Sequence, residues 1–85
     1  MNYDLFIERR AQKQLAKISR PHRDRIIDAI RELGDEPRPS GVKKLSGREG
    51  WRIHVGDYRV IYEIHDETHD ILVIALGHRR DIYRR

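Results

Sequence analysis

The sequence predicts an α+β fold with two layers, in which an N-terminal strand and a helical hairpin pack on one face of a mostly antiparallel four-stranded sheet. Apolar residues recur first at helical spacing in two consecutive segments. After residue 50 their spacing changes to two, the period of a strand that is buried on one face. The predicted order β-α-α-β-β-β leaves the second sheet face open to solvent. The 85 residues are expected to form a single domain (1–85) with one thin core.

The first part of the chain contains the expected strand and both helices. Residues 3–7 are rich in strand-forming side chains. Apolar residues at i, i+4 and i+7 predict a helix with a narrow buried stripe over 8–18. A second helix is expected over 21–33, because Pro21 suits the first helical turn and Gly34 suits the position just beyond the end.

The second part contains a loop and three strands. Prolines and glycines mark 35–50 as a loop, with a brief extended piece at 42–45. Residues 51–55 and 58–64 alternate between apolar and polar and flank a Gly-Asp turn, so they predict a hairpin. The continuous apolar run at 71–76 predicts a third strand that is covered on both faces and ends at glycine 77.

The composition favours a nucleic-acid partner. Eighteen Lys and Arg stand against fourteen Asp and Glu, and fourteen of the eighteen are Arg, whose fork matches phosphate oxygens. Six basic and two acidic residues lie between 38 and 59, and four basic and one acidic residue lie between 77 and 85. A solvated face that keeps a small protein soluble is the alternative explanation of this charge. Arginine is a poor generic choice within strands, however, so Arg52 and Arg59 favour a binding face.

Several classes of protein and site are excluded or disfavoured. The absence of cysteine excludes disulfides and thiolate nucleophiles, and it fits a reducing cytoplasm, where we expect the protein to act. The N-terminus lacks the pattern of a signal peptide, and no apolar run approaches the ~20 residues that span a bilayer, so no membrane partner is expected. A metal site at 65–70 is disfavoured, because a polar turn contains His and Asp for other reasons.

Three stretches resemble the RelE/ParE toxin superfamily. Residues 51–63 (WRIHVGDYRVIYE) are similar to its central hairpin, 77–83 (GHRRDIY) to its closing motif, and 43–47 (KKLSG) to the segment before the sheet. The resemblance covers nearly the whole chain. In this superfamily, RelE-like members are ribosome-dependent mRNA endonucleases and ParE-like members act on DNA gyrase. Both kinds pair with an antitoxin that wraps around the toxin.

The resemblance implies a set of site residues and partners. The implied catalytic residues are Arg52, His54, Arg59, Arg79 and Tyr83, with His54 standing where a lysine is usual. ParE-like members commonly lack this full set, so it favours the RelE-like branch. Further RNA contacts are expected from neighbouring cations, namely Lys43, Lys44, Arg48, Arg80 and Arg84. The expected partners are the ribosome, mRNA and a RelB-like antitoxin with an acidic amphipathic segment; no cofactor or metal is expected.

These residue types suit RNA cleavage by attack of the 2′-OH on the adjacent phosphate. Arg59 and Arg79 would stabilise the crowded phosphate, while a base removes the 2′ proton. His54 and Tyr83 are the two candidates for that base, and the sequence leaves the choice open. Two other functions also remain open: a gyrase inhibitor of the ParE kind, and a catalytically silent domain that only binds an antitoxin.

Overall fold

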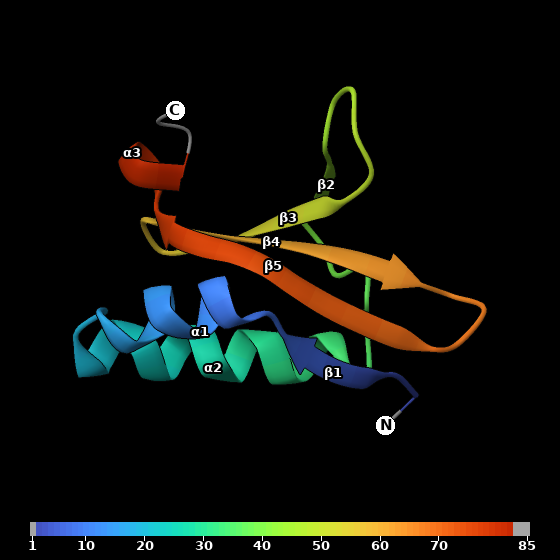
Figure 1. Ribbon diagram of the computed structural model, residues 1–85, viewed down its shortest axis with the longest axis horizontal. Helices are drawn as coiled ribbons and strands as arrows, with labels where there is room; N and C mark the ends of the chain where they lie inside the picture. Colours follow the sequence, from blue (N-terminus) through green and yellow to red (C-terminus); the bar gives the residue numbers. More distant parts are fainter. Residues whose placement is uncertain (1, 83–85) are drawn as a thin grey trace.

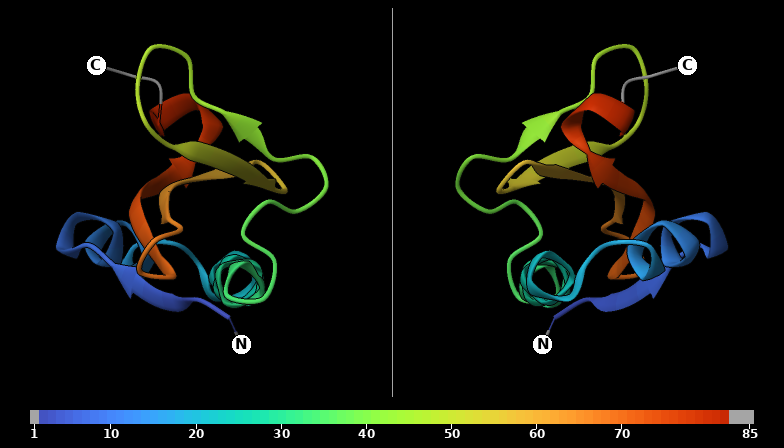
Figure 2. Two further views of the ribbon diagram at one scale, coloured as in Figure 1. Left: turned by 90° about the vertical axis from the view of Figure 1, so that its right-hand side faces the viewer. Right: turned by 90° about the vertical axis from the view of Figure 1, so that its left-hand side faces the viewer.

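The computed structural model describes residues 2–82, without the side chains of 81 and 82, and it confirms the predicted two-layer α+β fold. The elements are β1 (Asp4–Ile7), α1 (Arg9–Ala16), α2 (Arg20–Leu33), β2 (Lys43–Lys44), β3 (Trp51–Val55), β4 (Tyr58–His65), β5 (Asp70–His78) and α3 (Arg79–Ile82). Helices α1 and α2 lie on one side of the sheet, whereas α3 and the β2–β3 loop lie on the other side (Figures 1 and 2). We call the side of α3 the outer face of the sheet. Within the described residues, no helix is long and apolar enough to cross a membrane.

The sheet has five strands in the order β1-β5-β4-β3-β2, so the prediction of four strands is wrong. Strand β1 is parallel to β5, and the other neighbours are antiparallel. The additional strand is β2, which lies in the segment expected only as a brief extended piece. A strand of two residues has no measurable period, and its position depends on its pairing with Trp51 and Arg52 of β3.

The two helices begin and end close to their predicted bounds. Ser19 is the N-cap of α2, and proline occupies the first turn, where its missing N–H is not needed. Helix α1 ends at Ala16, two residues before the predicted end, although Ile18 is still buried in the core.

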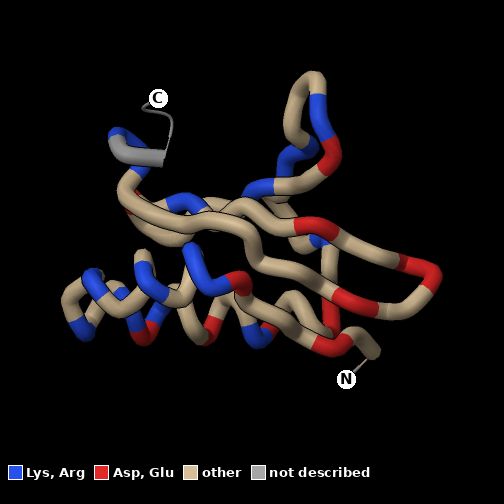
Figure 3. Tube along the Cα trace, viewed as in Figure 1, with Lys and Arg blue, Asp and Glu red and all other residues tan. Residues whose placement is uncertain are grey.

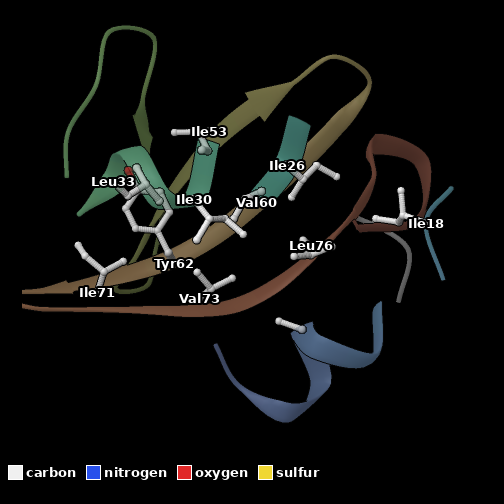
Figure 4. Close-up of a cluster of buried hydrophobic side chains, with 11 residues drawn as sticks. Ile18, Ile26, Ile30, Leu33, Ile53, Val60, Tyr62, Ile71, Val73 and Leu76 are labelled. Atoms are coloured by element: carbon white, nitrogen blue, oxygen red, sulfur yellow. The ribbon is translucent and has the colours of Figure 1, made fainter. Parts of the chain in front are cut away.

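The core lies between α2 and the inner face of the sheet (Figure 4). Helix α2 contributes three buried apolar residues, at i, i+4 and i+7, and strands β3, β4 and β5 contribute the facing side chains: Ile26, Ile30, Leu33, Ile53, Val60, Tyr62, Ile71, Val73 and Leu76. Tyr62 is fully buried and donates a hydrogen bond of 2.6 Å to the carbonyl oxygen of Pro37. Burial raises the pKa of Tyr62 to about 12, so the hydroxyl remains a donor that holds the loop after α2 against the sheet.

Strand β5 contains a bulge that explains its continuous apolar run. Ile61 pairs with Ala75 and Tyr62 with Val73, so Ile74 is the extra residue. The bulge changes the face on which successive side chains lie, so that Val73 and Leu76 are both fully buried. Leu72 and Ile74 are only half-buried, and the prediction that this run is covered on both faces is therefore wrong. The strand also continues through Gly77, where it was expected to end, as far as His78.

Candidate nucleic-acid interface

The outer face of strands β2, β3 and β4 carries four basic side chains. Ile53 of β3 and Val60 of β4 are paired and point into the core. Side chains alternate along a strand, so Arg52, His54 and Arg59 belong to the opposite, outer face. Lys43 of β2 pairs with Arg52 and shares that face. We call Lys43, Arg52, His54 and Arg59 the cation cluster.

The histidine of this cluster is held largely neutral at neutral pH. Its pKa is lowered from the ordinary value of 6.5, first by desolvation and then by the positive charges of Arg59, Arg52 and Lys43. His54 is exposed and directly opposite Arg59 in the ladder. A neutral imidazole can accept a proton or a hydrogen bond, whereas the arginines act only as donors.

The C-terminal end of β5 lies beside the cation cluster, as the sequence predicts. Arg59 pairs with Gly77, and a Cβ atom added to Gly77 would meet nothing within 4 Å. The sheet is therefore open next to Arg59. The backbone N–H of Arg79 donates to the carbonyl oxygen of Asp57 at 2.9 Å, which fixes the start of α3 against the β3–β4 turn. The exposed Arg79 and Arg80 consequently lie at the outer side of the sheet, near the hairpin.

His78 has a local structural role in this region. Its ring lies edge-on to Tyr58 with ring centroids 5.6 Å apart, and its Nδ1 accepts the backbone N–H of Arg80 at 3.2 Å. The ring thus caps the first turn of α3 and supports the position of Arg79.

The remaining predicted contact residues are spread over a wider area. Lys44 lies on the face opposite to Lys43, with its Nζ 5.7 Å from the centre of the Trp51 ring. Arg48 is exposed in the loop between β2 and β3, which rises from the outer side of the sheet. Tyr83 and Arg84 lie outside the described residues.

A cleft that the sequence analysis missed begins at His54. It has a volume of about 510 Å³ and lies between the C-terminal end of α2, the loop that follows α2, and β3. Glu32 and Glu36 line it on the helix side, and Lys43 and His54 line it on the sheet side. The two glutamates are four residues apart, a spacing that could have indicated a shared helix face. That the glutamates and His54 line the same cleft, however, depends on the packing of α2 on the sheet, which the spacing does not predict.

The opposite end of the sheet is acidic and held by hydrogen bonds (Figure 3). Asp66 in the β4–β5 turn accepts a hydrogen bond from the Tyr3 hydroxyl at 2.7 Å and one from the Arg38 guanidinium at 2.9 Å. Arg38 also lies over the Trp51 ring at 5.0 Å. His65 contacts Glu63 at 2.9 Å, so His65 and Asp66 point to separate partners. Among the described residues, no three His, Asp or Glu side chains converge as a metal site would require.

The comparisons with known proteins agree with this architecture. The model of a family described as "ParE toxin of type II toxin-antitoxin system, parDE" matches residues 5–83. Toxin RelG of Mycobacterium tuberculosis (strain ATCC 25618 / H37Rv) is 34% identical over 91 residues, which include 100% of both chains. An archaeal RelE–RelB complex from Pyrococcus horikoshii OT3 contains a chain with a TM-score of 0.84 and 30% identity, over 95% of this chain and 99% of that one. The intact E. coli RelBE toxin–antitoxin complex contains one with a TM-score of 0.79 and 28% identity, over 89% and 95%.

Proposed function

Because the chain belongs to the ParE toxin family of type II toxin–antitoxin systems, within the RelE/ParE superfamily, we propose that this RelE-like toxin is a ribosome-dependent mRNA endonuclease. The observation that carries the proposal is the cation cluster. Register alone brings Arg52, His54 and Arg59 to one open face, and the start of α3 adds Arg79. A cluster of like charges is costly for stability and is well suited to a polyanion.

The proposed reaction is a transesterification within the RNA. The 2′-oxygen attacks the adjacent phosphorus, the bond from phosphorus to the 5′-oxygen breaks, and the products are a 2′,3′-cyclic phosphate and a 5′-hydroxyl. Arg59 and Arg52 donate to the phosphate oxygens as negative charge accumulates on them, and Arg79 adds a third guanidinium. A base removes the 2′ proton, and an acid returns a proton to the departing 5′-oxygen.

His54 and Tyr83 are the two candidates for the base. The neutral His54 imidazole has a free lone pair at neutral pH, but its lowered pKa makes it a weak acceptor. Tyr83 would need its pKa to be lowered by the surrounding arginines. Among the described residues, the outer face beside Arg59 is open. Dependence on the ribosome follows, because an open site needs another particle to hold the message in an attack geometry. Such a toxin acts in the cytoplasm.

We also propose that the chain pairs with a RelB-like antitoxin. The solved relatives from P. horikoshii and E. coli are toxin–antitoxin complexes. In this chain, the outer face combines the cation cluster with the exposed ring of Phe6, which is 51% exposed, and the half-buried Leu72 and Ile74. An acidic amphipathic segment matches such a surface. If charge dominates, the dissociation constant of the complex rises steeply with salt; a constant that is indifferent to salt would contradict the acidic segment.

Cleavage in a bacterial cell-free translation system tests the endonuclease proposal. We expect new mRNA 5′ ends within translated regions, only while ribosomes translate, and a loss of about 10²–10³ in their rate of formation with Arg59→Ala. Plasmid supercoiling is followed in parallel as a test for gyrase inhibition. The matching family model is named after ParE toxins, and ParE-like members of the superfamily act on DNA gyrase. Altered supercoiling with intact mRNA would replace the endonuclease by a gyrase inhibitor. No effect in either assay would leave a domain that only binds its antitoxin.

A further inference from the structure

Helix α3 is too short to hold its own position. It has four residues, and helices shorter than ~12 residues are marginal on their own in water. The N–H groups of its first residues also lack partners within the helix. Both of these groups are bound from outside: Arg79 donates to the carbonyl oxygen of Asp57, and Arg80 donates to Nδ1 of His78 at 3.2 Å. The place of α3, and with it the place of Arg79, therefore depends on these two contacts.

Histidine is an unusual residue at this capping position. Ser, Thr, Asp and Asn are preferred there, because their short side chains hold an acceptor close to the backbone. A contact with Tyr58 explains why a ring is present. Tyr58 and His78 are opposite each other in the β4–β5 ladder, and their rings meet edge-on with centroids 5.6 Å apart. This packing limits the orientations of the imidazole and keeps Nδ1 directed at the N–H of Arg80.

Tyr58 in turn connects this pair to the helical layer. Its ring contacts that of His22 in the first turn of α2, with centroids 5.3 Å apart. Tyr58 and His78 also line a hollow of about 450 Å³ between the end of β5 and the turn that joins α1 to α2. Beside this hollow, β5 is bound to α1, because Oε1 of Gln14 accepts the backbone N–H of Leu76 at 2.8 Å. The capping histidine is thus anchored on the side of the sheet that carries the two long helices.

The same pair fixes the spacing of two arginines of the proposed active site. Arg59 directly follows Tyr58 in β4. Arg79 directly follows His78 at the start of α3, and the neighbouring rung of the ladder joins Arg59 to Gly77. A shift of the histidine against the tyrosine would therefore move Arg79 relative to Arg59. Groups that act together on one phosphate have to be held within about 0.5 Å of the productive geometry.

We infer that His78 is a positioning residue for the proposed reaction. Its Nδ1, oriented by the contact with Tyr58, fixes the start of α3, and Arg79 is thereby placed to act on the same phosphate as Arg59. The inference rests on the proposed endonuclease function. Only a ring nitrogen without a hydrogen can accept the N–H of Arg80, so the imidazole carries its hydrogen on Nε2. His78 acts on cleavage through Arg79 and not by contact with the RNA.

Single-turnover ribosome-dependent cleavage tests the inference with substitutions that separate the ring from its acceptor. His78→Phe keeps a ring that can pack on Tyr58, whereas His78→Asn keeps an acceptor for the N–H of Arg80. We expect the maximum rate at saturating toxin to fall about tenfold in His78→Phe and to stay within about threefold of wild type in His78→Asn. The toxin concentration that gives half the maximum rate should be unchanged in both. His65→Ala, which removes an exposed imidazole at the other end of β4, is the matched control and should cleave like the wild type.

The Arg79→Ala background shows whether the effect acts through Arg79. His78→Phe added to Arg79→Ala should cause no further loss, because the group that the histidine positions is already absent. A further loss in the double variant would overturn the inference, since His78 would then affect cleavage by another route. Equal rates in His78→Phe and His78→Asn would also overturn it, because the acceptor would then not matter.

An NMR measurement on the whole chain, without ribosomes, separates failure of the positioning from failure of the proposed function. The ¹⁵N signals of the His78 ring should show that Nδ1 carries no hydrogen at neutral pH. The Arg80 amide hydrogen should exchange with solvent about tenfold faster in His78→Phe than in the wild type. If no message is cleaved but both signatures appear, the endonuclease proposal fails and the role of His78 in placing α3 stands. A hydrogen on Nδ1, or an unchanged exchange rate, overturns the inference even where messages are cleaved.

Discussion

Strand β4 joins two ends of the sheet that use charge in opposite ways (Figure 3). At its start, Arg59 faces His54, and desolvation together with the positive charges gathered there lowers the pKa of the histidine. Just beyond its end, Asp66 is bound by Arg38 and by Tyr3. The acidic end connects the loop after α2, the N-terminus and the β4–β5 turn. Charges that are paired in this way hold segments of the fold together, whereas the like charges of the cation cluster form the face that we propose binds RNA.

Among substitutions at the basic end of the sheet, Arg59→Ala should have the largest effect on the cleavage rate. By its register the side chain belongs to the outer face beside Gly77, where we propose that it contacts the reacting phosphate. Removal of one donor to a developing oxyanion costs about 10²–10³ in rate. We expect that loss in single-turnover ribosome-dependent cleavage, with the fold retained. Arg25→Ala, at an exposed position of α2, is the control and should keep full activity. An Arg59→Ala variant that cleaves normally would remove the cation cluster from the reaction.

Arg79→Ala should have a smaller effect on the same assay. A charge-assisted hydrogen bond contributes about 1.5–3 kcal/mol, which corresponds to a loss of about 10- to 100-fold. The backbone N–H that binds Asp57 remains in the variant, so α3 should keep its place. Arg80→Ala, the neighbouring exposed arginine, distinguishes a specific contact from general charge: equal losses in the two variants would mean that only the net charge of α3 matters.

The sequence predicted the basic face of the sheet, because the positions of its residues depend on the alternation of side chains along a strand. Alternation along residues 51–64 was sufficient to place Arg52, His54 and Arg59 on one face, and the pairing of β5 beside the hairpin confirmed their closeness to α3. The bulge at Ile74 was not predictable, because an inserted residue in an apolar run looks the same as a strand buried on both sides.

The cleft and the hydrogen bonds at the acidic end of the sheet were also not predictable, for a different reason. Arg38 and Asp66 are 28 residues apart, and Glu32 reaches the neighbourhood of His54 only because α2 packs on β3. Contacts of that kind depend on the relative placement of elements, which a local pattern does not contain.

Asp66→Asn tests the acidic end and should affect stability without affecting cleavage. The hydrogen bonds from Arg38 and Tyr3 lower the pKa of Asp66 below its ordinary 3.8. The carboxylate therefore stabilises the fold above the unfolded-state value of 3.8, and that contribution is lost as pH falls through the lower folded-state pKa. Urea midpoints of the wild type should decline with acid more steeply than those of Asp66→Asn. The control is Glu67→Gln, which should keep the wild-type slope; equal slopes in wild type and Asp66→Asn would contradict a structural role for the paired charges.

The smallest expected effect on cleavage comes from His54→Lys. His54 can affect both the stability of the fold and the proposed reaction. Its folded-state pKa lies below 6.5, so the unfolded chain takes up the proton first as pH falls through 6.5, and the folded state loses stability until its own pKa is passed. His54→Lys carries a fixed charge and should remove this contribution to the slope of the urea midpoints measured between about pH 5 and 8. Because desolvation and the neighbouring cations make His54 a weak base, we expect His54→Lys to keep the cleavage rate at neutral pH within a few-fold, and Tyr83→Phe to lose far more. The reverse pattern, with wild-type cleavage falling as pH drops through the pKa of His54 and His54→Lys flattening that profile, would assign the base to the histidine.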